Sequence, residues 1–241
     1  DWALSGSQLL ILDQNLSTVY ALGANDKKSA ILAAGEDLKG GQKIAVGPPA
    51  GGAAAYVLAE KGIVEINLKV KSLKVKIPKD SAWGEIADME IFGDNLYLLD
   101  KNGEIWKYPA AAEGFGPKQR WLKEKIDLSQ AAAMVIDGSV WVLKNNGEIL
   151  KLVQGQKADF RIKGLSKSLS SPKALLADSD SESLYLLDTG NSRIVVLKKT
   201  GEYDREYLWS GIKDATDLAV FEKDSQLFLL SGSQVFQVNI K

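Results

Sequence analysis

A run of apolar residues that ends in a turn residue recurs along the chain and limits the folds open to it. The run is Leu-Tyr-Leu-Leu-Asp at both 96–100 and 184–188. With weaker copies included, successive runs lie 41 to 46 residues apart and end at Asp13, Ala59, Asp100, Lys144, Asp188 and Ser231. A repeat of this length indicates a series of similar units that bury their apolar faces against one another.

Each repeat unit contains four strand-like segments. An apolar segment before the run predicts an inner strand A, the run predicts strand B, and an apolar segment after a polar turn predicts strand C. A weaker outer strand D is expected at residues 29–32, 73–77, 120–122, 159–162 and 203–209. No stretch has a sustained helical period. The sequence therefore predicts an all-β protein, a six-bladed β-propeller of four-stranded antiparallel blades.

The predicted blades cover the chain as a single domain. Their approximate bounds are 1–40, 41–84, 85–127, 128–171, 172–214 and 215–241. The last blade stops directly after strand C, so we expect it to lack its outer strand, which residues upstream of Asp1 would supply if it exists. Two connections, 47–52 and 109–117, are rich in Gly, Pro or Ala and are expected to be surface insertions.

The clearest unit spans residues 183–201. Its first apolar run meets the turn formers Asp188-Thr189-Gly190-Asn191, and a β-branched run opens after Arg193. This pattern resembles one repeat of the NHL family of β-propellers, in which a strand ends in Asp, a Gly-Asn turn follows, and Arg-Ile opens the next strand. The resemblance is weaker at 96–108 and 140–152. It implies a binding module, since NHL-type propellers serve as extracytoplasmic sensor domains of some bacterial receptor kinases and as protein- or RNA-binding modules.

The residue types that are missing restrict the chemistry. The chain has no Cys and no His, which excludes metal sites built on those ligands, catalytic triads, Cys nucleophiles and His general bases. The 30 basic and 31 acidic residues give a net charge of −1, so bulk electrostatics attracts the protein neither to nucleic acid nor to an anionic membrane. The sequence has no apolar run of roughly 20 residues and no signal-peptide pattern at its start.

The first residue of each predicted inner strand is expected at the mouth of the central channel. These residues are Asp1, Lys43, Asp88, Ala133, Ala174 and Asp217. The carboxylates Asp1, Asp88 and Asp217 could hold Ca²⁺ or Mg²⁺, or a small polar ligand, through hard oxygen atoms. The alternative, which we favour, is that these groups cap the strands by hydrogen-bonding neighbouring backbone amides and waters.

Two tryptophans lie in connections between predicted blades. Trp83 and Trp209 each precede an inner strand and have Gly close behind them, so both could be presented on the face that carries Asp88 and Asp217. Exposed Trp is a common anchor of protein interfaces. The alternative is that each ring packs into the wedge between adjacent blades. Within strand patterns we expect only packing tryptophans, at Trp2, Trp106 and Trp141.

The polar residues of the repeat have structural explanations. An Asp at a hairpin turn, as at Asp13, Asp100 and Asp188, hydrogen-bonds its own backbone, and Arg193 is expected to pair with Asp188 or with the neighbouring blade. Lysine alternates with apolar or small residues along 69–76. Such lysines protect an outer strand from pairing with other chains; contact with an acidic partner is the alternative.

These features favour a non-enzymatic recognition or scaffold module. We expect the sensor or protein-interaction domain of a larger extracytoplasmic signalling protein, of the kind that other segments anchor in a bacterial membrane. The expected partner is a protein or a small polar ligand, with no nucleic acid, no insertion of this domain into a membrane, and a monomeric state. The alternative is a metal-dependent propeller hydrolase or lyase that uses the carboxylates of the channel; no nucleotide-binding motif is present.

Overall fold

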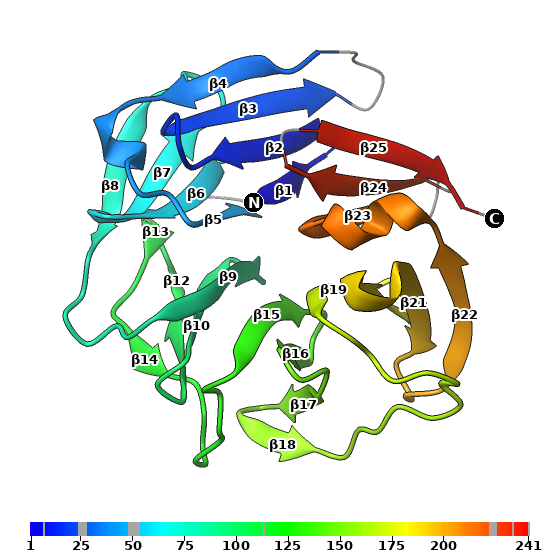
Figure 1. Cartoon of the computed structure of the whole chain (residues 1–241). Coiled ribbons are helices and arrows are strands. Elements are labelled where there is room, and N and C mark those ends of the chain that lie inside the picture. The colour runs from blue at the N-terminus through cyan, green and yellow to red at the C-terminus, as the bar shows by residue number, and fades with distance from the viewer. Residues whose placement is uncertain are drawn as a thin grey trace. The chain divides into compact units, whose positions relative to one another are not determined.

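The structure is a computed structural model that describes residues 1–6, 8–23, 28–47, 54–112, 114–221, 226–232 and 234–240. The chain divides into two compact units, and Figure 1 labels the strands that build them. Unit 1 comprises residues 1–100 and 105–120, and unit 2 comprises residues 101–104 and 121–241. The expected insertion at 47–52 lies outside the described residues from 48 onward. No helix in the described part of the chain is long and apolar enough to cross a membrane.

Unit 1 contains the first three blades. In each blade the strands are antiparallel, and in the first two they lie side by side in the order in which they occur along the chain. The first blade is β1 (Trp2–Ser5), β2 (Gln8–Asp13), β3 (Thr18–Gly23) and β4 (Ala30–Ala34); the second is β5 (Lys43–Gly47), β6 (Ala54–Ala59), β7 (Gly62–Asn67) and β8 (Leu73–Pro78); the third is β9 (Ile86–Phe92), β10 (Asn95–Asp100), β11 (Glu104–Tyr108) and β14 (Gln119–Arg120). A short helical turn, η1 (Glu36–Leu38), links the first two blades.

Unit 2 contains the other three blades with the same topology. The fourth blade is β15 (Ala131–Ile136), β16 (Val140–Lys144), β17 (Ile149–Val153) and β18 (Gln156–Ala158); the fifth is β19 (Pro172–Ala177), β20 (Ser183–Asp188), β21 (Arg193–Lys198) and β22 (Tyr203–Leu208). The sixth is β23 (Asp217–Phe221), β24 (Gln226–Ser231) and β25 (Gln234–Asn239). The turns η2 (Thr189–Asn191) and η3 (Ser210–Asp214) complete the unit. The predicted fold class, an all-β six-bladed β-propeller, is confirmed.

The missing strand of the last blade is also confirmed for the described residues. Five blades have four strands, whereas the sixth sheet has three in the order β23-β24-β25. Strand β25 pairs on one side with β24 from Gln226↔Asn239 to Ser231↔Gln234. Within the described residues its other side carries no strand, so its outward N–H and C=O groups form an open sheet edge.

Side chains from consecutive blades form the cores. Strands point alternate residues to opposite faces, and the faces of the first and second blades share a cluster that includes Leu12, Val19, Ile44 and Val64. In unit 2 the fifth and sixth blades share a cluster that includes Ile194, Leu218 and Leu229. The apolar runs of the repeat are therefore the inter-blade core, which is why they recur once per blade. Trp2 and Trp141 are buried and Trp106 is half-buried, in agreement with their predicted packing roles.

One outer strand was predicted in the wrong place. Strand D of the fourth blade was expected at 159–162, but β18 occupies Gln156–Ala158 and pairs directly with β17. A tight turn makes this possible, because Gln154 and Gly155 have φ of 51° and 85°, as a two-residue hairpin turn requires. Phe160, within the segment where the strand was expected, packs edge-on against Trp141 with ring centres 5.0 Å apart.

The expected insertion in the third blade has structure of its own. Within it, β12 (Ala110–Ala111) pairs antiparallel with β13 (Gly114–Phe115). The ring of Phe115 lies 5.0 Å from the ring of Tyr56 in the second blade. This insertion therefore extends the contact between the second and third blades.

Candidate functional site

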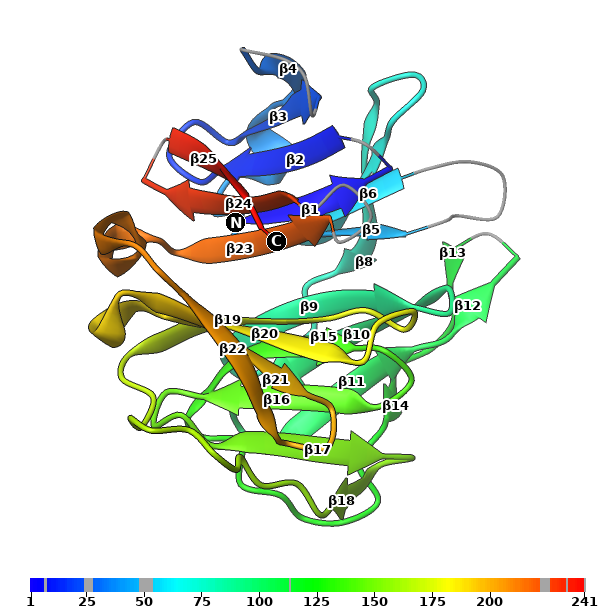
Figure 2. The ribbon, with the colours of Figure 1, turned by 90° about the vertical axis from the view of Figure 1, so that its right-hand side faces the viewer.

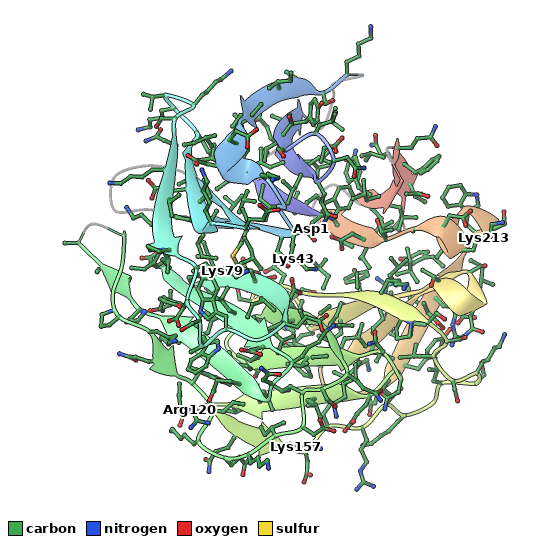
Figure 3. All side chains as sticks on the ribbon, turned by 60° about the vertical axis from the view of Figure 1, so that its left-hand side comes forward. Asp1, Lys43, Lys79, Arg120, Lys157 and Lys213 are labelled. Atoms are coloured by element: carbon green, nitrogen blue, oxygen red, sulfur yellow. The ribbon has the colours of Figure 1, made fainter. Side chains whose placement is uncertain are left out.

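Three of the predicted channel residues come together in unit 1. The ammonium nitrogen of Lys43 lies 3.6 Å from Oδ1 of Asp1 and 3.3 Å from Oδ1 of Asp88. Figure 3 shows Asp1 and Lys43 side by side at the start of the inner strands. The three side chains are 15–24% exposed. The cation between the two carboxylates is thus the chain's own ammonium group.

The carboxylates also bond backbone amides, as the capping interpretation predicted. Oδ2 of Asp1 accepts a hydrogen bond of 2.7 Å from the amide of Ile44, and Oδ1 of Asp88 accepts one of 3.0 Å from the amide of Met89. In unit 2, Oδ1 of Asp217 accepts a hydrogen bond of 2.8 Å from Leu218. The three carboxylates therefore bond backbone amides, as that interpretation expected.

A carboxylate metal site was the other interpretation of these residues. No group of three His, Cys, Asp or Glu side chains in that part of the chain is arranged to hold a metal ion. Asp217 belongs to unit 2, and in unit 1 Lys43 already neutralises Asp1 and Asp88. The remaining predicted channel residues, Ala133 and Ala174, are buried in unit 2 and offer no ligand atoms.

Trp83 packs inside unit 1. Its indole Nε1 donates a hydrogen bond of 2.8 Å to the hydroxyl of Tyr108, and the two rings meet edge-to-face. The ring joins the core shared by the second and third blades. Burial raises the pKa of Tyr108 to about 12, despite the opposing hydrogen bond from Trp83. The packing alternative thus describes Trp83, whose polar edge is already bonded.

Trp209 is placed differently. It follows β22 at the start of η3, and its side chain is partly exposed. The ring lies 5.3 Å from the ring of Phe236 on β25, at 66° to it. Gly211 packs beneath the indole so closely that a Cβ at this position would lie 2.5 Å from the ring atoms. Trp209 is therefore held in one orientation while part of its surface remains open to solvent.

A neighbour of Trp209 was missed by the sequence analysis. Leu208, the last residue of β22, is 70% exposed and Trp209 is 40% exposed. Leu208 pairs with Arg193 and points to the face of β22 opposite to that of Tyr207 and Trp209, so it is a separate exposed residue. Trp209, the half-buried Phe236 and the open edge of β25 form what we call the Trp209 surface. Leu208 lies at the end of an outer strand. The sequence does not show whether a single apolar side chain in such a strand is buried or exposed.

The turn carboxylates of the repeat hold different partners. Oδ1 of Asp13 accepts hydrogen bonds of 3.0 Å from the amides of its own turn, as predicted. Asp100 and Asp188 instead bond the connection that enters their blade: Asp100 accepts from the amide of Gly84 at 2.8 Å, and Asp188 accepts from that of Ser170 at 2.7 Å. The expectation for these two residues was incomplete, because the entering connection lies on the same face as the turn.

Arg193 has the partner that the sequence predicted. Its Nε lies 2.7 Å from Oδ2 of Asp188, and its Nη1 lies 2.9 Å from Oε2 of Glu206. Its Nη2 also donates to the carbonyl oxygens of Lys167 and Ser168. Burial acts to lower the pKa of Arg193, but the hydrogen bonds to Asp188 and Glu206 raise it above its ordinary value. The NHL-like residues of this blade are a structural clamp.

The structure is similar to solved structures only at the level of the fold. Neither a protein-family model nor a curated protein matches the chain. A structure of the nidogen/laminin complex matches with a TM-score of 0.68 and 14% identity, covering 99% of this chain and 88% of that one. Hydrazine synthase of Kuenenia stuttgartiensis matches with 0.59 and 11%, covering 99% and 94%. The computationally designed Ika8 protein matches with 0.59 and 12%, covering 99% and 70%.

Proposed function

We propose that the chain is a non-enzymatic recognition module that binds a partner protein through the Trp209 surface. The observation that carries the proposal is that Trp209 is 40% exposed yet fixed by Phe236 and Gly211. An aromatic side chain that is ordered before binding loses little conformational freedom when the partner arrives. Trp is one of the residue types enriched among the hot spots that contribute most of the binding free energy at protein interfaces.

The composition of the Trp209 surface favours a protein over a small polar ligand. Phe236 adds a half-buried aromatic ring directly beside Trp209. Burying such side chains stabilises a complex by roughly 25 cal/mol per Å² of apolar surface. A small polar ligand gains little from them, whereas an apolar side chain of a protein partner covers both.

The open edge of β25 supports an extended partner segment. Strand β25, Gln-Val-Phe-Gln-Val-Asn, carries no charged residue, whereas the outer strand β22 carries Asp204, Arg205 and Glu206. Charged side chains usually prevent an outer strand from pairing with other chains. An extended segment could pair with the outward N–H and C=O groups of β25 and place an apolar side chain on Trp209.

The other blades indicate which residues such a segment should carry. In the fifth blade Tyr203 of the outer strand β22 packs against the fourth blade, and in the second blade Leu73 and Val75 of β8 pack against the first. The partner segment is therefore expected to have apolar residues at alternate positions. We propose that this module is the sensor or protein-interaction domain of a larger extracytoplasmic signalling protein, in keeping with its NHL-like repeat.

The proposal is tested by quantitative affinity capture with matched variants. The immobilised chain is exposed to an extract of its own cells, and the captured proteins are quantified by mass spectrometry. We expect Trp209→Ala to lower recovery of the specific partner by about 30-fold, corresponding to the loss of about 2 kcal/mol at an interface centre. Val153→Ala is the control, because Val153 is also an exposed apolar residue, 40% exposed, but lies on β17.

The outcomes separate the proposal from its alternatives. Gly211→Ala should weaken capture as well, because the new Cβ would displace the indole. Equal recovery of all partners by wild type, Trp209→Ala and Val153→Ala would exclude the Trp209 surface as the binding site. Circular dichroism of each variant establishes that the compared proteins are equally folded.

A further inference from the structure

The hairpin of β7 and β8 carries a concentrated positive charge at its tip. Residues 67–79 contain five lysines and no Asp or Glu. Lys69, Lys71 and Lys74 are exposed, and between the first two stands Val70, which is 71% exposed. We call these four residues the basic tip. In Figure 2 the turn of this hairpin, in cyan, stands clear of the neighbouring strands of unit 1.

The basic tip is an ordered turn. Oδ1 of Asn67 accepts hydrogen bonds from the amides of Lys69 and Val70 at 3.0 and 3.1 Å, and the carbonyl of Asn67 accepts one from Lys71 at 2.8 Å. Lys71 has a φ of 55°, a conformation in which Gly or Asn is usually found. The turn thus presents a lysine side chain where backbone geometry alone favours a smaller residue.

The charge of the basic tip is not neutralised within the described residues. Lys76, farther along β8, pairs with Glu65 at 3.3 Å. Lys69, Lys71 and Lys74 form no ion pair with any residue in the described ranges. Salt screens exposed charges over about 8–10 Å, so the net charge of −1 for the whole chain does not cancel the field close to the tip.

We propose that the basic tip makes a peripheral contact with an anionic lipid surface. Lys69, Lys71 and Lys74 would lie among the negatively charged headgroups, and Val70 would enter the boundary between headgroups and acyl chains. Long lysine stems allow the ammonium groups to remain in water while an apolar neighbour is buried. The contact is interfacial and reversible, and it involves no membrane-spanning segment.

Two features favour lipid over an acidic protein segment. All the basic residues of this hairpin are lysines, and lysine acts as a hydrated point charge, whereas paired recognition of carboxylates favours arginine. Lysine is also depleted in protein–protein interfaces. Moreover, the tip is convex with an apolar residue at its apex, a shape that suits a soft planar surface.

The lipid contact is independent of the proposed function. The basic tip lies in the turn between β7 and β8 and at the start of β8 in unit 1, and the Trp209 surface belongs to unit 2. Trp209→Ala should therefore leave lipid binding unchanged. The lipid experiment can therefore fail while the capture experiment succeeds, and the capture experiment can fail while the lipid experiment succeeds.

The test is co-flotation with lipid vesicles at low ionic strength. One set of vesicles contains phosphatidylcholine alone, and the other contains phosphatidylcholine with phosphatidylglycerol. We expect the chain to float only with the second set, and Lys69→Ala/Lys71→Ala/Lys74→Ala to lower its partition coefficient by about 100-fold. Val70→Ala should lower it by about 5-fold. The control, Lys39→Ala/Lys157→Ala/Lys213→Ala, removes three exposed lysines elsewhere and should retain most of the binding.

Three results would overturn the proposal. The first is equal flotation with neutral and anionic vesicles, and the second is an equal loss of binding in the two triple variants. The third is binding of the tip to poly-L-glutamate without binding to anionic vesicles, which would assign it to an acidic protein segment. A decrease of vesicle binding as salt rises supports the electrostatic part of the contact.

Discussion

Nε of Arg193 lies 2.7 Å from Oδ2 of Asp188, and these two charged side chains are only 3% and 0% exposed. The pair ties the start of β21 to the end of β20, while Asp188 also accepts a hydrogen bond from the amide of Ser170. Each side chain therefore neutralises the charge of the other, and burying either charge without such a partner would cost much free energy. This clamp fixes the turn of the fifth blade to the connection that enters it.

Asp188→Ala should destabilise the protein far more than Asp13→Ala. The first variant leaves the guanidinium of Arg193 buried without its main carboxylate, at a cost of about 3–5 kcal/mol. The second removes only a turn hydrogen bond at a more exposed position and should cost about 1 kcal/mol. Urea unfolding of both variants measures the difference in the free energy of unfolding. Equal losses would show that the Arg193 pair adds nothing to the fifth blade.

Stability should fall at alkaline pH because Tyr108 resists ionisation in the folded state. Its pKa is raised from 10.0 to about 12, so the folded protein retains a proton that the unfolded chain releases. The stabilising contribution is complete below pH 10.0 and is lost as pH rises through the folded-state pKa. The free energy of unfolding should decrease by about 1.4 kcal/mol per pH unit in this window.

Urea unfolding at a series of pH values tests this prediction. Tyr108→Phe removes the ionisable group and should flatten the decrease. Tyr56 contributes in the same direction, because burial raises its pKa too, so the double variant should be flatter still. An unchanged slope in both variants would contradict the account.

Gly201→Ala should be much more damaging than Gly138→Ala. Both glycines have a positive φ, 93° and 112°, so both substitutions carry a backbone cost of about 1 kcal/mol. At Gly201 a Cβ would also lie 2.1 Å from the carbonyl oxygen of Arg161, whereas at Gly138 no described residue beyond its two chain neighbours would lie within 4 Å of a Cβ. We expect about 3 kcal/mol or more for Gly201→Ala, as found for strained or overpacked sites. Thermal unfolding that ranks the two variants equally would contradict this expectation.

Calcium or magnesium at millimolar concentration should leave the melting temperature of the wild-type chain unchanged. Lys43 already lies between Asp1 and Asp88 at 3.6 and 3.3 Å. Lys43→Met should lower the melting temperature, because two carboxylates lose their shared cation, and added calcium should recover part of that loss. Differential scanning fluorimetry checks both statements. A higher melting temperature of the wild type with either ion would contradict this prediction and support the alternative function, a metal-dependent hydrolase or lyase.

The repeat explains why so much of the fold was predictable from sequence. The run that ends at Asp188 forms β20 and pairs in register with β21, from Ser183↔Lys198 to Asp188↔Arg193. The two strands and the turn of such a hairpin are consecutive in the chain, so a local sequence pattern is enough to predict them. Placement failed where tertiary contacts decided the outcome, as at Phe160, whose ring packs on Trp141 from a segment outside any strand.

The candidate site was less predictable because exposure is a property of the assembled blades. Trp83 and Trp209 occupy similar positions in the repeat, and each has a Gly one or two positions later. Trp83 meets Tyr108 of the third blade's third strand, whereas Trp209 meets Phe236 beside an open sheet edge. The difference depends on the partners that each ring finds in space, and neither partner is a neighbour in sequence.

Site-specific photocrosslinking at Gln234 is the most direct test of recognition through the Trp209 surface. Gln234 is exposed and lies on the same face of β25 as Phe236, two residues away. A photoreactive phenylalanine replaces Gln234 in one variant and Val153 in the other, and both are expressed in the cells from which the chain comes. We predict a light-dependent adduct with another protein from position 234 alone, and its loss when Trp209→Ala is added. An absent adduct at 234, or the same adduct from both positions, would contradict this account.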